Sequence, residues 1–250
     1  MAVCVLLSAV ASLHARPAVT VVSRTVRFVG TENLPTGLLL KQGSSWIPVN
    51  APLFDAGAPL VLADAQPLEF YRDQPSADPA SPAPRRVLVG RGMLPADKES
   101  LLVVLFAAPP DKDGLSLRAL AYDSGLEGGY GEQALRVINL LPVNVAMQAD
   151  ARVTEVPPGE ARSVSPKLDA RYRSRFKLAR QDAGQWAPMK NGLISIGPKS
   201  RVTLLVVYSA TGMAHLMTAA ERAQFGGHPP PGFFVISVAE SVPAVASKPQ

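Results

Sequence analysis

The chain has 250 residues, of which 47% are hydrophobic and 18% are charged. This balance is typical of a globular protein and excludes a wholly disordered one. The 24 prolines and 19 glycines favour short strands and many turns over long helices, and the formal net charge is +5.

Residues 1–15 are predicted to form a secretory signal peptide. Met1–Ala11 is apolar and uncharged, and it is much shorter than the roughly 20 residues that a membrane-spanning helix needs. No Lys or Arg precedes the apolar run, which leaves open a true start upstream, and a buried first strand that runs on into AVTVV is the alternative. The only cysteine, Cys4, lies in this segment, so a mature chain would have no disulfide. We therefore expect a secreted or periplasmic protein of the cell envelope, without a transmembrane segment.

Two stretches of the chain contain the same order of similar segments. The matches are RFVGTENLP (27–35) with RVINLLP (136–142), LLVVLFAA (101–108) with TLLVVYSA (203–210), and GLSLRALAYDS (114–124) with GFFVISVAES (232–241). Each copy has about seven short β-branched or apolar runs bounded by turn residues, with no long amphipathic helix between them. We therefore expect an all-β fold of two tandem immunoglobulin-like antiparallel β-sandwich domains, at 24–124 and 134–241.

The segments outside these runs have their own signals. Glycine-rich residues 125–133 are expected to form a linker between the domains, and residues 242–250 a disordered tail. Thr218 and Glu221 have the spacing of a capping box, which predicts a short helix over Ala219–Phe225 in a loop of the second domain.

The positive charge of the chain is concentrated in the second copy. Residues 24–124 have ten Lys/Arg against eleven Asp/Glu, a difference of −1, whereas residues 133–241 have thirteen against seven, a difference of +6. Four cations alternate with other residues in RYRSRFKLAR: Arg171, Arg173, Arg175 and Lys177. Alternate side chains of a strand share one face, so these four are expected to line the solvent side, with Tyr172, Phe176 and Leu178 packed beneath.

This stripe of cations supports two interpretations. It is a candidate ligand-binding site for an anionic partner, such as an acidic polysaccharide, lipid head groups or an acidic envelope protein. Alternatively, cations on an exposed or edge strand prevent edge-to-edge aggregation. Nucleic acid is not expected as a partner, because no exposed aromatic side chains accompany the cations.

The sequence contains no recognisable catalytic constellation. His215 and His228 lie in one loop without a cysteine or a second cluster of ligands, so neither a metal site nor a cofactor is expected. GRG at 90–92 begins like a dinucleotide-binding fingerprint, but Pro95 follows where a helix would have to begin. We therefore expect the protein not to be an enzyme.

Two tryptophans, Trp46 and Trp186, occupy comparable places in the two copies. Exposed on a sandwich face they could stack on sugar rings, and buried they would anchor the core or a loop.

Two resemblances to known families follow from local motifs. ALRVINLLPVNVAMQ at 134–148, followed by VTEVPPGEARSV at 153–164, resembles the start of uncharacterised secreted bacterial β-sandwich repeats, which usually occur in tandem. LPADKESLLVVLFAAPP at 94–110 is similar to a segment of periplasmic pilus chaperones, and SRTVRF at 23–28 is similar to their first strand. Such chaperones donate a strand to complete a pilin fold, and the resemblance implies that Arg24 would hold a subunit carboxylate.

These observations predict a non-catalytic exported cell-envelope protein with a binding or structural role. A periplasmic pilus-type assembly chaperone is the second hypothesis. A carbohydrate-active enzyme is the third.

Overall fold

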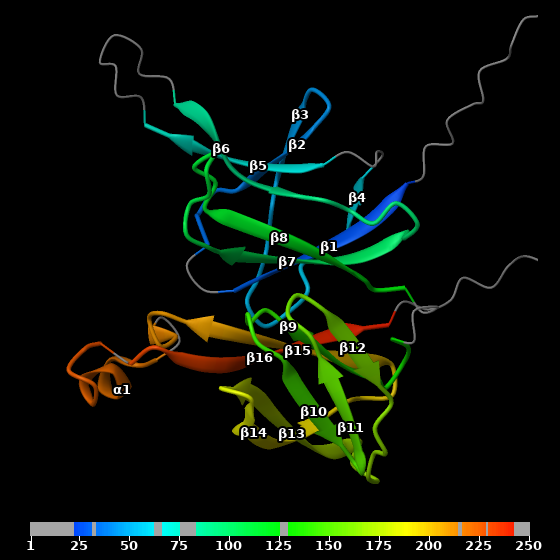
Figure 1. The fold of residues 1–250 in the computed structure, drawn as a ribbon. Coiled ribbons are helices and arrows are strands. Elements are labelled where there is room, and N and C mark those ends of the chain that lie inside the picture. Colours follow the sequence, from blue (N-terminus) through cyan, green and yellow to red (C-terminus); the bar gives the residue numbers. More distant parts are fainter. Residues whose placement is uncertain are drawn as a thin grey trace, which may run out of the picture.

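A computed structural model of the chain describes residues 23–31, 34–62, 67–75, 84–125, 130–214, 217–228 and 230–242. The predicted signal peptide at 1–15 and all but the first residue of the predicted tail at 242–250 lie outside these residues, as does His215. The described chain is almost entirely strand, arranged in sandwich-type layers with one short helix, so the predicted fold class is confirmed (Figure 1). Within these ranges no helix is long and apolar enough to cross a membrane.

The helix lies where the capping box predicts it. Helix α1 (Ala219–Ala223) begins after Thr218, whose side chain accepts a hydrogen bond from the backbone N–H of Glu221. The Glu221 carboxylate accepts one in return from the backbone N–H of Thr218. Both donors would otherwise be unpaired at the helix start, so the box fixes this end of the helix.

The first half of the chain contains eight strands. They are β1 (Arg24–Gly30), β2 (Leu39–Gln42), β3 (Ser45–Pro48), β4 (Leu60–Leu62), β5 (Leu68–Gln74), β6 (Arg85–Gly92), β7 (Ser100–Ala107) and β8 (Leu117–Asp123). The row β4-β1-β7-β8 faces the row β3-β2-β5-β6 across a hydrophobic core. In that core the rings of Phe28 and Phe70 pack edge to face, with centroids 6.0 Å apart.

The second half repeats this order with another eight strands. They are β9 (Leu135–Asn139), β10 (Val145–Ala149), β11 (Arg152–Val156), β12 (Ala161–Val164), β13 (Arg173–Asp182), β14 (Gln185–Ser195), β15 (Ser200–Ser209) and β16 (Gly232–Ser241). The sheet β12-β9-β15-β16 faces the sheet β11-β10-β13-β14 across a second core. Strand by strand, these rows have the same order as β4-β1-β7-β8 and β3-β2-β5-β6.

The segments that match in sequence occupy equivalent strands in this repeat. They form β1, β7 and β8 in the first half and β9, β15 and β16 in the second. In each half the first strand pairs in parallel with the seventh, and the seventh pairs antiparallel with the eighth. The duplication visible in the sequence is therefore also a duplication of topology.

One pairing distinguishes the two halves. In the first half, β6 pairs in parallel with β8 and joins the two rows into a single eight-stranded sheet. Gly90 and Gly92 lie at this junction, and a Cβ atom on Gly90 would come within 2.6 Å of the carbonyl oxygen of Leu117. The GRG motif thus allows two strands to approach closely, which is a structural use of glycine rather than a phosphate-binding one.

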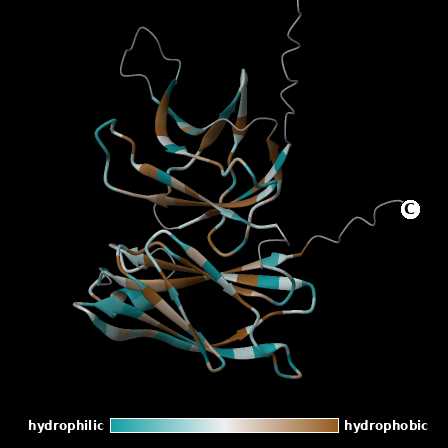
Figure 2. Ribbon diagram, turned by 45° about the vertical axis from the view of Figure 1, so that its right-hand side comes forward, coloured by the Kyte–Doolittle hydropathy of each residue, from teal (hydrophilic) through white to brown (hydrophobic). Residues whose placement is uncertain are grey.

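The two halves pack against each other through the strands in the middle of the molecule. Along β7, Leu101 and Val103 face the core of the first half, whereas Leu102 and Val104 face the second half. Strand β15 behaves in the same way, so both strands are buried on both faces. This explains why their sequences are continuous apolar runs, and the central strands are accordingly coloured mostly as hydrophobic in Figure 2.

A buried ionic cluster lies beside this interface, in the second half. The ring of Tyr130 packs against the guanidinium groups of Arg136 and Arg201, whose Cζ atoms are 3.9 and 4.3 Å from its centroid. Glu240 accepts hydrogen bonds from the hydroxyls of Tyr130 and Thr203 and forms ion pairs of 3.5 and 3.3 Å with the two arginines. Burial raises the pKa of Tyr130, so its hydroxyl keeps its proton and remains a donor.

Candidate functional site

The alternation predicted for the cationic stripe is present in β13. Phe176 and Leu178 point into the core of the second half and are buried. Arg175 and Lys177 point the other way and are exposed, and Arg173 is half-buried on the same side. The outer face of the sheet β11-β10-β13-β14 therefore carries a row of cations along one of its two central strands.

The first cation of the predicted stripe and the tyrosine that follows it do not belong to the strand. Arg171 and Tyr172 lie in a turn before β13, and Tyr172 adopts a left-handed conformation with φ of 56°. The turn is fixed by Asp169, whose carboxylate accepts hydrogen bonds from the backbone N–H groups of Arg171 and Arg173. Tyr172 is consequently 44% exposed, and the prediction that it packs beneath the cations is wrong.

Asp169 also pairs with the side chain of Arg173. Its Oδ2 atom accepts hydrogen bonds from Nε and Nη2 of Arg173, at 3.1 and 2.9 Å. The hydrogen bond from Arg173 is the main reason that the pKa of Asp169 lies below its ordinary value. Arg173 is thus partly neutralised, whereas Arg175 and Lys177 have no side-chain hydrogen bond or ion pair within the described ranges.

The position of β13 in its sheet bears on the aggregation-preventing interpretation of the stripe. The strand pairs with β10 on one side and with β14 on the other, so it is not an edge strand. Both edges of β13 are paired over Phe176–Arg180, so Lys177 does not lie on an open strand edge, whereas Arg175 lies just beyond the last residue that pairs with β10. Protection of a strand edge therefore does not explain Lys177, and the aggregation-preventing interpretation of the stripe stays a prediction.

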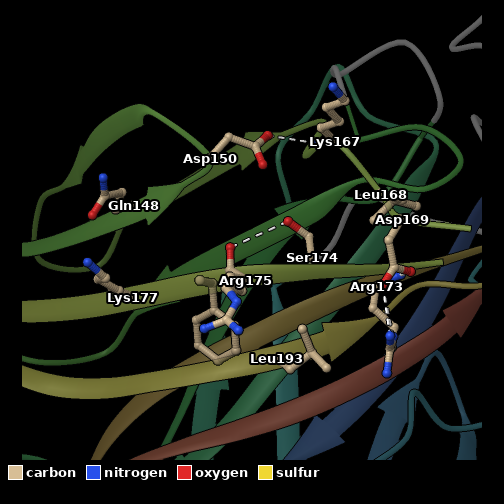
Figure 3. A pocket seen from close by; sticks show the side chains of 11 residues that line it. Gln148, Asp150, Lys167, Leu168, Asp169, Arg173, Ser174, Arg175, Lys177 and Leu193 are labelled. Carbon is tan, nitrogen blue, oxygen red and sulfur yellow. Dashed lines mark hydrogen bonds and ion pairs between the residues drawn. The ribbon is translucent and has the colours of Figure 1, made fainter. Parts of the chain in front are cut away.

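The cations border an open hollow of about 530 Å³. Figure 3 shows Gln148 beside Lys177 and Leu193 beside Arg175, as the strand registers require. Asp150, Lys167, Leu168 and Asp169 line its other end. The Asp150 carboxylate accepts a 2.7 Å hydrogen bond from the backbone N–H of Lys167 and so holds that segment at the rim.

A second hollow, of about 560 Å³, continues across the same face. It shares Gln148 and Lys177 with the first, and its lining is otherwise mostly apolar or amide: Ala146, Val153, Leu178, Ala179, Pro188, Met189, Lys190 and Asn191. The face is therefore a continuous shallow surface on which cations and aliphatic groups lie together.

Several residues of this site were not predicted from the sequence. Lys167, Gln148 and Leu193 come from different segments and reach β13 only through strand pairing and the turn before the strand. For Lys167 the sequence contains a weak indication, because this lysine precedes the stripe of cations by only a few residues. The other two had none, since the register between strands cannot be read from either segment alone.

The equivalent face of the first half is neutralised. Strand β5 corresponds to β13, and its outward side carries Glu69 and Asp73 instead of cations. Asp73 forms a 3.0 Å ion pair with Arg86, and Glu69 forms one of 3.5 Å with Arg91. The outward acids of β5 are thus paired with arginines, whereas Arg175 and Lys177 on β13 have no ion pair within the described ranges.

The other residues singled out in the sequence lie apart from this face. Arg24 is 2% exposed, and its Nη2 atom donates a 2.9 Å hydrogen bond to the carbonyl oxygen of Ala96. Its Nε and Nη1 atoms have no hydrogen-bond partner in the described parts of the chain. Over the same residues, no group of three His, Cys, Asp or Glu side chains could hold a metal ion.

The two tryptophans differ in their surroundings. Trp46 packs edge to face on Tyr71 with 4.9 Å between ring centroids, and the guanidinium of Arg86 lies 4.5 Å from its ring. Trp186, near the start of β14, is 46% exposed. Trp46 is therefore an anchor within its own half, whereas Trp186 is available for contact with another molecule.

Compared with protein-family models and with curated proteins, the chain matches none of them. Function is therefore inferred from the residues of the site itself.

Proposed function

We propose that this is a non-catalytic, exported cell-envelope protein that binds an anionic partner on the outer face of the sheet β11-β10-β13-β14. The observation that carries the proposal is the pair of exposed, unpaired cations, Arg175 and Lys177, on one of the two central strands of that sheet. Neither has a side-chain hydrogen bond or ion pair within the described residues.

Charge and geometry both support this proposal. Alternate residues of a strand are roughly 6.5–7 Å apart, so the two cations repel each other and both gain from an anion placed between or above them. Of the two acids that line the hollow, Asp169 is already engaged by Arg173, and Asp150 accepts a hydrogen bond from the backbone N–H of Lys167. A surface with an excess of one charge raises the local concentration of ligands of opposite charge and speeds their association.

Support for export comes from the leader-like sequence at the start of the chain, which lies outside the described residues. None of the contacts in the described part adds support for the chaperone or the carbohydrate-active enzyme hypothesis, and both remain predictions. The classes of partner that fit are an acidic polysaccharide, a lipid surface or an acidic protein of the envelope, since each carries negative charge that can pair with Arg175 and Lys177.

A matched pair of double variants tests the proposal. Arg175→Gln plus Lys177→Gln removes the two central cations, and Lys112→Gln plus Lys199→Gln removes two exposed lysines elsewhere with the same change in net charge. Retention on immobilised dextran sulfate is measured over a range of salt concentrations. We expect the first variant to lower the slope of log affinity against log salt by about two, roughly one for each lost contact.

The control variant should change this slope much less. Equal loss of retention in the two variants would show that only net charge matters, and no loss in the first would overturn the proposal. Thermal unfolding of both variants confirms that each remains folded.

A further inference from the structure

The face that carries the unpaired cations also exposes large aliphatic side chains. Val153 on β11 is 64% exposed and Leu193 on β14 is 55% exposed. In the strand registers, Leu193 lies directly opposite Arg175, and Val153 lies opposite Gln148, which in turn lies opposite Lys177. Aliphatic groups therefore flank the two cations from both sides on one surface.

Trp186 belongs to the same surface. It lies opposite Gln181 in the hairpin formed by β13 and β14. Gln181 has the same parity along β13 as Lys177, so both residues point to the outer face. An exposed tryptophan at the margin of a cationic surface is typical of proteins that sit at a membrane–water boundary, because its ring is amphipathic.

We infer that the anionic partner is the surface of a lipid bilayer that contains anionic head groups. This inference rests on the proposed function and names its partner. Arg175 and Lys177 contact the head groups, while Val153, Leu193 and Trp186 enter the boundary between head groups and acyl chains. A soluble polyanion would satisfy the cations and leave the aliphatic groups in water, whereas a bilayer surface accommodates both.

The physical magnitudes imply weak and reversible binding. Each basic residue near an anionic membrane surface contributes about fivefold to the affinity, and this contribution is screened by salt. Burial of two partly exposed aliphatic side chains contributes about tenfold more, and that part persists at high salt. Binding should therefore weaken with salt without disappearing completely.

Co-sedimentation with vesicles tests the inference. The probes are vesicles of phosphatidylcholine alone and of phosphatidylcholine mixed with phosphatidylglycerol, together with soluble dextran sulfate. We expect binding to the mixed vesicles and little binding to phosphatidylcholine alone. Arg175→Gln plus Lys177→Gln should weaken vesicle binding by about thirtyfold, which is roughly fivefold for each cation.

A second double variant separates a membrane from a soluble polyanion. Val153→Ser plus Leu193→Ser should weaken binding to mixed vesicles by about tenfold and leave binding to dextran sulfate unchanged. Both positions are exposed, so the fold should tolerate the change, and thermal unfolding checks this.

Tryptophan emission gives an independent measurement. In a Trp46→Phe background, Trp186 is the only remaining tryptophan. Its emission should shift to shorter wavelength when mixed vesicles are added, because the ring leaves water, and should not shift with dextran sulfate.

The outcomes distinguish the two levels of the proposal. Binding to dextran sulfate without binding to mixed vesicles overturns the membrane inference and leaves the proposed function standing. The inference is also overturned if Val153→Ser plus Leu193→Ser binds mixed vesicles as tightly as the unmodified protein and the emission of Trp186 does not shift. Absence of binding to both probes overturns the proposed function as well.

Discussion

The outer faces of β5 and β13 occupy the same place in the repeated topology, yet they carry opposite arrangements of charge. On β5, Glu69 and Asp73 point outward and are paired with arginines of β6. On β13, Arg175 and Lys177 point outward without partners in the described chain. The same strand order accommodates both arrangements, so the fold itself does not require the unpaired cations.

The two halves differ in their interiors as well. The first half has a hydrogen bond of 3.1 Å between the hydroxyls of Ser100 and Ser124. By strand register, the same positions in the second half hold Arg201 and Glu240, which form a buried ion pair. At these equivalent positions the second half therefore holds a buried ion pair in place of two hydroxyls, whereas its outer cations Arg175 and Lys177 have no such partner in the described chain.

The largest effect is expected at the buried ionic cluster. Glu240→Gln keeps the size of the side chain but leaves two buried arginines without a counter-charge. We expect it to lower the free energy of unfolding by about 3–5 kcal/mol. Chemical denaturation measures the loss, and Glu132→Gln, at an exposed position, serves as the control with an expected change within about 0.5 kcal/mol. Equal stability of the two variants would show that the cluster is not a source of stability.

A smaller loss is expected at the junction between β6 and β8. In Gly90→Ala, the new Cβ would lie 2.6 Å from the carbonyl oxygen and 2.7 Å from the Cβ of Leu117, so the strands must separate. We expect a loss of about 1–3 kcal/mol in denaturant unfolding. The control is Gly131→Ala, because no atom lies within 4 Å of the added Cβ there. If both substitutions had the same effect, the close approach of these strands would not require glycine.

The difference in charge between the outer faces of β5 and β13 can be tested by creating unpaired cations in the first half. Glu69→Gln plus Asp73→Asn would release Arg91 and Arg86 from their acids. In the background of Arg175→Gln plus Lys177→Gln, we expect retention on dextran sulfate to recover by up to about fivefold for each released arginine. Elution in a salt gradient measures the recovery. Unchanged elution would mean that unpaired cations alone do not make such a face a binding surface.

The smallest effect concerns Asp169. Its pKa is lowered, chiefly by the hydrogen bond from Arg173, so its stabilising contribution is fully present above the pKa of the unfolded chain, about 4. The contribution is lost as the pH falls through the lower pKa of the folded state. Asp169→Asn should therefore melt at a slightly lower temperature than the unmodified protein at pH 7, and the difference should vanish in acid. A difference that grew on acidification would contradict this assignment.

Much of the architecture was readable from the sequence because it depends on local patterns. The alternation around Phe176 and Leu178 predicted the two faces of β13, and the capping box at Thr218 predicted the helix. Tyr172 was misplaced because the strand pattern was extended across a turn that Asp169 forms through backbone hydrogen bonds.

The remaining features depend on contacts between distant segments. The pairing of Arg201 with Glu240 across 39 residues becomes visible only when strands β15 and β16 are in register. The role of Gly90 requires β8 as a neighbour, and the hollow requires Gln148 and Leu193 beside β13. The sequence placed cations on a face but could not indicate what surrounds them.

The apolar layer between the halves has a consequence for symmetry. Each half contributes its first, seventh and eighth strands to this layer, and equivalent positions of the two halves belong to it: Val29 and Ile138, Val104 and Leu205, Leu120 and Ile236. Contact between equivalent patches is the hallmark of a two-fold, isologous association. The layer between the halves therefore resembles the interface of a homodimer, although both contributing surfaces belong to one polypeptide.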